Sequence, residues 1–137
     1  MPAAGRSGIL LGLCAIALVA CIPVPRGANP LAVRFMTPEQ LRAYSEQVFR
    51  HQNKLLTRMM FAGFEISLLG GNPEQEILEA ERAVEEACSS LNRLASMRST
   101  SESPGALLRG RAWLEVRRCE QHADELEQIL NRYGIPG

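Results

Sequence analysis

The sequence predicts an all-α fold, namely a three-helix antiparallel up-down-up bundle stapled by a disulfide. Three observations lead to this prediction. Apolar residues recur at three- and four-residue spacing along three segments, which is the period of a helix with one buried face. Short turns rich in Gly, Pro and Ser separate the segments, and short connections make long helices antiparallel neighbours. Aromatic residues make up only 5% of the 137 residues, and we see no alternating pattern typical of a strand.

Residues 1–20, MPAAGRSGILLGLCAIALVA, have the layout of an export signal. Arg6 supplies a positive charge, and an uncharged apolar run follows from Gly8 to Ala20. This run is short for a membrane span, which takes about 20 residues. We therefore expect residues 1–20 to be a signal peptide, with an uncleaved membrane anchor as the alternative.

The segment ends in Leu18-Val19-Ala20-Cys21, which resembles the lipobox of bacterial lipoproteins. This resemblance implies cleavage before Cys21 and attachment of palmitate-type acyl chains to it, so that the protein contacts the membrane through a lipid anchor. Cys14 is a poorer lipid site because a bulky leucine precedes it. Ile22, and not aspartate, follows the lipobox, which by the same resemblance implies sorting to the outer membrane of the cell envelope, facing the periplasm.

The next segment, residues 22–36, contains three prolines and a glycine and shows no helical period. Proline lacks a backbone donor and favours extended conformations. We expect residues 21–36 to be the lipidated cysteine and a semi-rigid tether. The tether would hold the helical bundle domain, residues 37–137, away from the lipid headgroups.

The first helix is expected over about residues 38–69. Thr37 supplies an N-cap hydroxyl and Pro38 suits the first helical position, while Gly70-Gly71 ends the helix. Its apolar positions recur with helical spacing, and they are Leu41, Tyr44, Val48, Leu55, Met59, Ala62, Ile66 and Leu69.

The second and third helices are expected over about residues 73–98 and 106–132. The second begins at Asn72-Pro73 with the same cap pattern, and its glutamates gather near the N-terminus, where the helix dipole favours negative charge. A polar turn precedes the third helix, and Gly134 and Pro136 stop it. The apolar stripe of the third helix is Leu108, Ala112, Val116, Cys119, Ala123, Leu126, Leu130 and Tyr133.

Cys88 lies on the apolar stripe of the second helix and Cys119 on that of the third. Folding the hairpin at the intervening turn brings the two cysteines side by side, within the separation that a disulfide needs. An exported protein enters a compartment in which such bonds form and persist. We therefore predict a Cys88–Cys119 disulfide. It would stabilise the fold by about 3–4 kcal/mol in the chain-entropy model.

Few residues suggest chemistry. The chain has two histidines, and Cys119 and His122 share one helical face, so Cys88, Cys119 and His122, with His51, could supply zinc ligands if the thiols were free. The disulfide competes with this reading. We identify no catalytic residues and no cofactor site, and expect the protein not to be an enzyme, although the members of a triad need only be adjacent in space.

Charged residues suggest surface roles. Carboxylate pairs such as Glu81/Glu85 are expected on solvated helix surface with no desolvation to raise a carboxyl pKa. A basic patch beside Trp113 could grip a phosphate or a carboxylate, although interleaved acidic residues favour ordinary surface pairing; its members are Arg109, Arg111, Arg117 and Arg118. Because the formal net charge is zero, we expect no nucleic-acid partner.

The segment 59–69, MMFAGFEISLL, fits a simple bundle least well, because Glu65 is its only charged residue. Phe61, Phe64 and Leu68 form a second apolar stripe beside the one assigned to the core. Either this part of the helix is buried on more than one side, or the stripe is an exposed groove for a partner helix or a second copy. The candidate partner-binding residues are Met60, Phe61, Phe64, Leu68 and Trp113.

The first functional hypothesis is a non-enzymatic interaction or scaffold module, a membrane-anchored lipoprotein that binds another envelope protein, or a second copy, through its apolar helix surface. The layout resembles the all-helical pilotins of type II secretion, small disulfide-containing lipoproteins that escort secretins to the outer membrane. This resemblance is one of architecture and carries no binding residue over. The alternatives are a periplasmic metal- or stress-sensing protein using Cys88, Cys119 and His122, and a purely structural envelope lipoprotein.

Overall fold

The computed structural model describes residues 22–26 and 29–136. The expected signal peptide, Cys14 and the lipobox with Cys21 lie outside the described residues. The chain divides into two compact units, residues 1–42 and 43–137. No helix in the described part of the chain is both long enough and apolar enough to cross a membrane.

The segment expected to be an extended tether forms an antiparallel β-hairpin, whereas no strand was predicted anywhere in the chain. Strand β1 covers Ile22–Arg26 and pairs with β2, Asn29–Met36, in a register that sets Ile22 opposite Met36. The alternating apolar residues of β2 were the missed signal. Proline is tolerated here because both strands of a two-stranded sheet are edge strands.

Two helices occupy the region expected to form one helix over residues 38–69. Helix α2 covers Pro38–Phe61 and α3 covers Gly63–Leu69. At the start of α2, the Thr37 backbone N–H donates to Gln40 Oε1 (3.0 Å) and the Gln40 N–H donates to Thr37 Oγ1 (3.3 Å), which is a reciprocal capping box. The ladder continues across the junction, where Ile66 N donates to Ala62 O (2.9 Å), so the junction is a local kink.

The second expected helix is also interrupted. Helix α4 covers Gly71–Ala87 and α5 covers Ser89–Ser99, with a kink at Cys88, where ψ is 1°. Serine pairs such as the one that follows are common at helix kinks. Gly70 and Gly71 both have positive φ, 58° and 56°, so the turn between α3 and α4 needs residues without a Cβ.

Helix α6, Ala106–Arg132, supplies a long buried face to the bundle. Its buried residues match the apolar stripe read from the sequence at six positions, Ala112, Val116, Cys119, Ala123, Leu126 and Leu130. Helices α4 and α5 pack against it. The apolar residues buried on α2, α4 and α5 include Val48, Leu55, Ile77, Val84 and Leu91. The described residues from 43 onward therefore form a helical bundle with one apolar core.

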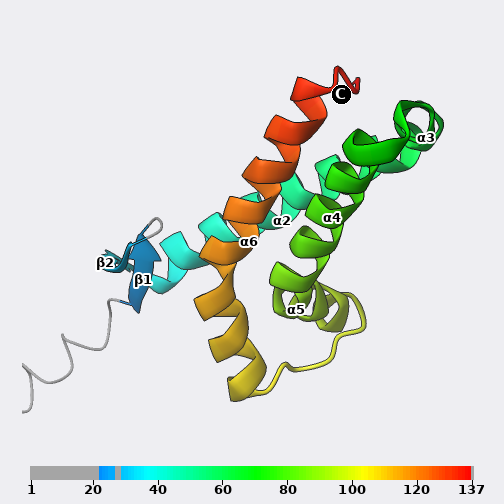
Figure 1. Cartoon of the computed structure of the whole chain (residues 1–137). Coiled ribbons are helices and arrows are strands. Elements are labelled where there is room, and N and C mark those ends of the chain that lie inside the picture. The colour runs from blue at the N-terminus through cyan, green and yellow to red at the C-terminus, as the bar shows by residue number, and fades with distance from the viewer. Residues whose placement is uncertain (1–21, 27–28, 137) are drawn as a thin grey trace, which may run out of the picture. The chain divides into compact units, whose positions relative to one another are not determined.

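The predicted disulfide between Cys88 and Cys119 is confirmed, with an S–S distance of 2.08 Å and a Cα–Cα distance of 4.7 Å. It joins the kink between α4 and α5 to the middle of α6, and both cysteines are fully buried. At the other end of α4, Glu76 accepts hydrogen bonds from Arg132 Nη1 (2.8 Å) and from the Tyr133 hydroxyl (2.5 Å). These two attachments show that α4 and α6 run in opposite directions, as Figure 1 also shows.

Helix α2 is attached to α6 by polar side chains. The Tyr44 hydroxyl donates to Glu120 Oε2 (2.6 Å), and Arg58 Nη2 donates to Asn131 Oδ1 (2.9 Å). Both partner pairs advance in the same sense along the chain, so the described part of α2 beyond residue 42 runs in the same direction as α6. The fully buried Gln52 amide donates to Asn92 Oδ1 and so ties α2 to α5.

Candidate functional site

The kink at the end of α2 exposes four large apolar side chains, Met60, Phe61, Phe64 and Leu68, which we call the apolar corner. Their exposed fractions are 70%, 79%, 72% and 69%, respectively. They repeat at three- and four-residue spacing and therefore share one face of the α2–α3 segment. The structure thus contradicts the reading in which this stripe is buried, because its side chains are exposed and do not pack in the core.

The opposite face of the same segment is anchored in the core. Met59, Ala62 and Ile66 are buried, at helical spacing from one another. Helix α3 packs against α4, which covers only one side of it. A segment that is apolar all round but has a neighbour on one side only must leave half of its apolar surface in water. The apolar corner is that half.

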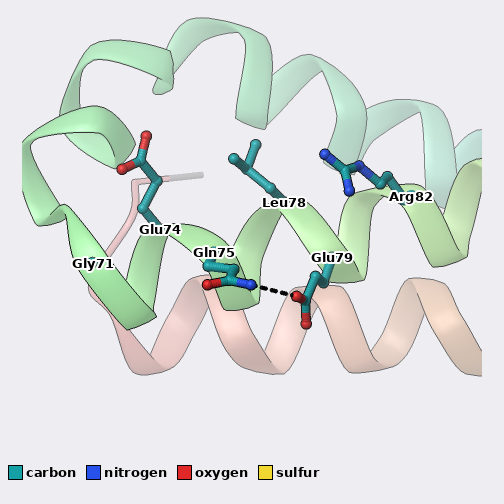
Figure 2. A pocket seen from close by; sticks show the side chains of 6 residues that line it. All are labelled: Gly71, Glu74, Gln75, Leu78, Glu79 and Arg82. Atoms are coloured by element: carbon teal, nitrogen blue, oxygen red, sulfur yellow. Dashed lines mark hydrogen bonds between the residues drawn. The ribbon is translucent and has the colours of Figure 1, made fainter.

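A shallow depression lies on α4, directly after the turn that ends α3. It is lined by six residues of this one helix, Gly71, Glu74, Gln75, Leu78, Glu79 and Arg82. Figure 2 shows the Leu78 side chain between the Glu74 carboxylate and the Arg82 guanidinium, all three on the side of α4 where the ribbons of α2 and α3 pass. Gln75 Nε2 donates to Glu79 Oε1 (2.9 Å) on a separate side. The depression adds a half-exposed leucine flanked by opposite charges to the surface near the apolar corner.

Trp113 is not brought to the apolar corner. It lies in the second turn of α6, at the opposite end of this helix from its attachment to α4 at Glu76. It is half-buried, and its indole Nε1 is buried without a hydrogen-bond partner among the described residues. The basic patch beside it is divided, because Arg117 bonds to Glu120 while Arg109, Arg111 and Arg118 are exposed.

The pKa values of several groups respond to the packing of the helices. Burial, followed by the hydrogen bond to Glu120, raises the pKa of Tyr44 to about 12. The Tyr133 hydroxyl and then Arg132 lower the pKa of Glu76. Burial, with the nearby Glu85 carboxylate as a second cause, raises the pKa of Glu81. The expectation that the Glu81/Glu85 pair is free of desolvation was therefore wrong for Glu81.

The sulfur and imidazole groups do not assemble as the zinc hypothesis required. The thiolates of Cys88 and Cys119 are consumed in their disulfide, and His122 Nδ1 lies 2.9 Å from Glu125 Oε2 on the same helix. His51 instead faces two carboxylates of α6, with Nε2 3.4 Å from Asp124 Oδ1 and 3.7 Å from Glu127 Oε2. This cluster was not predicted from the sequence. Its only signal was the helical spacing of the two acidic residues.

Comparisons of the chain with protein-family models, curated proteins and solved structures found no match. Two surfaces of the described chain thus stand out by their geometry. One is the apolar corner, where large side chains face water. The other is the His51 cluster, where three ligand-type atoms from two helices converge.

Proposed function

We propose that this protein is a non-enzymatic interaction module that binds a partner protein of the cell envelope through its apolar corner. The observation that carries the proposal is the exposure of Met60, Phe61, Phe64 and Leu68, each about 70% or more in water. Burying one such side chain in an interface gains about 1.5–3 kcal/mol. Aromatic side chains clustered in this way are typical anchors of protein interfaces.

The partner best suited to this surface is a helix with an apolar face. The four side chains repeat with the period of a helix, and a helix laid alongside would meet them with its own anchors at three- and four-residue spacing. The methionine side chain is flexible and fits surfaces of different shape, so Met60 can pack against a helix of a partner protein. A second copy of the chain presents the same surface and is the alternative occupant.

The proposed localisation is the periplasmic side of the outer membrane, where lipidation of Cys21 would anchor the protein. The disulfide supports an exported protein, because such bonds persist in oxidising compartments and are rare in the cytosol. Two or three acyl chains would anchor the protein stably, with each buried methylene contributing about 0.8 kcal/mol. A binding surface held near the membrane would meet envelope proteins at raised local concentration.

We also propose that the five helices of the described residues form an up-down-up bundle of three parts, α2–α3, α4–α5 and α6. The contacts at both ends of α4 and along α2 support alternating directions. This layout is similar to that of the all-helical pilotins, which also present a helix-binding surface on a disulfide-containing lipoprotein.

The test uses the full-length protein with its own export signal. It is expressed in its native Gram-negative host, so that the envelope proteins it would meet are present. A photo-reactive amino acid at Phe64 should cross-link to a partner protein, while the same group at Leu107, which is 87% exposed on α6, should not. Phe61→Asp should abolish the cross-link from position 64, and Leu107→Asp should leave it intact. Far-ultraviolet circular dichroism of each variant verifies that the helices are unchanged.

Different outcomes separate the hypotheses. A cross-link from position 64 between two copies of the chain would replace the heterologous partner by a homo-oligomer. Absence of any cross-link from position 64, with normal levels of membrane-bound protein, would favour a purely structural lipoprotein and contradict the proposal. Equal cross-linking from positions 64 and 107 would show a non-specific surface and contradict it as well.

A further inference from the structure

We propose that His51, Asp124 and Glu127 form a binding site for a divalent transition-metal ion such as Zn²⁺. One ligand atom from each residue, imidazole Nε2 and two carboxylate oxygens, lies within 4.8 Å of the other two. Imidazole and carboxylate are among the ligands that Zn²⁺ takes in proteins. The imidazole favours a transition metal over Ca²⁺ or Mg²⁺, which prefer an all-oxygen set.

The helices themselves place the three groups. Asp124 and Glu127 are three positions apart on α6, so their side chains project from the same face, one turn from each other. His51 projects from α2 toward that face, between the carboxylates. Two ligands from one helix and a third from its neighbour make a common layout for a metal site within a helical bundle.

The site is fixed on both sides by bonds between the same two helices. Tyr44 and Arg58 stand seven residues before and after His51, two helical turns away on the same face of α2. The Tyr44 hydroxyl donates to Glu120 (2.6 Å), and the Arg58 guanidinium donates to Asn131 (2.9 Å). These bonds hold α2 and α6 at a set distance, so the ligands are organised before an ion arrives.

The His51 Nε2 atom gives a second, independent indication of a ligand. It is inaccessible to solvent and has no hydrogen-bond partner among the described residues. Its distances of 3.4 and 3.7 Å to the two carboxylate oxygens exceed the usual hydrogen-bond range. Leaving such a buried atom unpaired is unfavourable, and coordination to a metal ion would remove that cost.

The spacing fits an ion of the size of Zn²⁺. With Zn–N and Zn–O bonds near 2.1 Å, two ligand atoms on a tetrahedral ion are about 3.4 Å apart. The observed separations from Nε2 are 3.4 and 3.7 Å, and the two carboxylate oxygens lie within 4.8 Å of each other. Both carboxylates are partly exposed, which leaves an entry path and room for water as a fourth ligand. Such an ion would link α2 to α6 much as the disulfide links α4–α5 to α6.

The test titrates ZnCl₂ into the purified full-length protein, without a histidine tag and after alkylation of free thiols and treatment with a chelator. We expect one equivalent of Zn²⁺ to bind and to raise the thermal unfolding midpoint, because a ligand that binds only the folded state stabilises it. His51→Gln should weaken Zn²⁺ binding at least tenfold and remove the thermal shift. Asp124→Asn should do the same while retaining the imidazole.

His122→Gln is the matched control, because His122 also faces a carboxylate of α6, Glu125, but has no third ligand-type group beside it in the described chain. This variant should bind Zn²⁺ as the parent protein does. Without metal, all variants should unfold near the parent temperature, which separates lost binding from lost folding. The proposal is overturned if the parent protein fails to bind Zn²⁺ at millimolar concentration, if His51→Gln binds normally, or if His122→Gln weakens binding equally.

Discussion

The region around the disulfide and the apolar corner contain the same kinds of residue, but the side chains of the first are buried and those of the second are exposed to water. Both are helical, and in both the apolar residues repeat at three- and four-residue spacing. The apolar repeats next to Cys88 and Cys119, such as Val84, Leu91, Val116 and Ala123, are buried, because α4 and α5 pack against α6. At Phe61 and Phe64 the repeats are exposed, although Met59, Ala62 and Ile66 on the opposite face of the same segment are buried. The difference teaches that the packing partner, and not the residue type, separates a buried core from an exposed apolar surface.

The largest expected effect is on the buried side of this comparison. The double variant Cys88→Ala/Cys119→Ala should lose about 3–4 kcal/mol of unfolding free energy, because the disulfide closes a loop with a sequence separation of 31 in the unfolded chain. Urea denaturation followed by circular dichroism measures the loss. Reduction of the parent protein should reproduce it, and a loss below about 1 kcal/mol would show that the helices alone hold this region together.

A smaller effect is expected for Val116→Ala, one helical turn from Cys119. Val116 is fully buried, and removing two of its methyl groups should lower the unfolding free energy by about 2 kcal/mol. Leu114→Ala, two positions away on the exposed side of the same helix, is the control and should change it by less than about 0.5 kcal/mol. Equal losses in the two urea titrations would contradict the assignment of the buried face.

The third expected effect concerns Tyr44, where α2 meets α6. In a Tyr133→Phe variant Tyr44 is the only tyrosine left, and it should titrate with a pKa of about 12 instead of 10.0. The fold favours the neutral phenol, so the stability from this contact is complete below pH 10 and is lost as the pH rises toward 12. Ultraviolet absorbance of tyrosinate measures the midpoint. A midpoint near 10 in the folded protein would show that this end of α2 detaches from α6.

Helical periodicity predicted the buried side well. The stripe on α6 could be read from the sequence because a bundle helix has one buried face, and the same stripes aligned Cys88 with Cys119. Periodicity could not say which of two apolar stripes at 59–69 is buried, since that depends on where α4 lies. It also could not show the kinks at Ala62 and Cys88, because the hydrogen-bond ladder continues through both.

Two other features were beyond the sequence for physical reasons. The hairpin at residues 22–36 was hidden by its prolines, which argue against a strand unless every strand is an edge. The cluster of His51 with Asp124 and Glu127 joins helices that are distant in the sequence. Its geometry depends on the crossing of α2 over α6, which local spacing does not specify.

The smallest expected effect tests the exposed side of the comparison directly. Phe64→Ser should change the unfolding free energy by less than about 0.5 kcal/mol, because its side chain is 72% exposed and contributes little to the core. Urea denaturation provides the measurement, and Ile66→Ser, on the buried face of the same short helix, provides the contrast with a clear loss. If Phe64→Ser were as damaging as Ile66→Ser, the apolar corner would be part of the core. If it is neutral, the aromatic ring is not needed for folding, as the proposed contact with a partner requires.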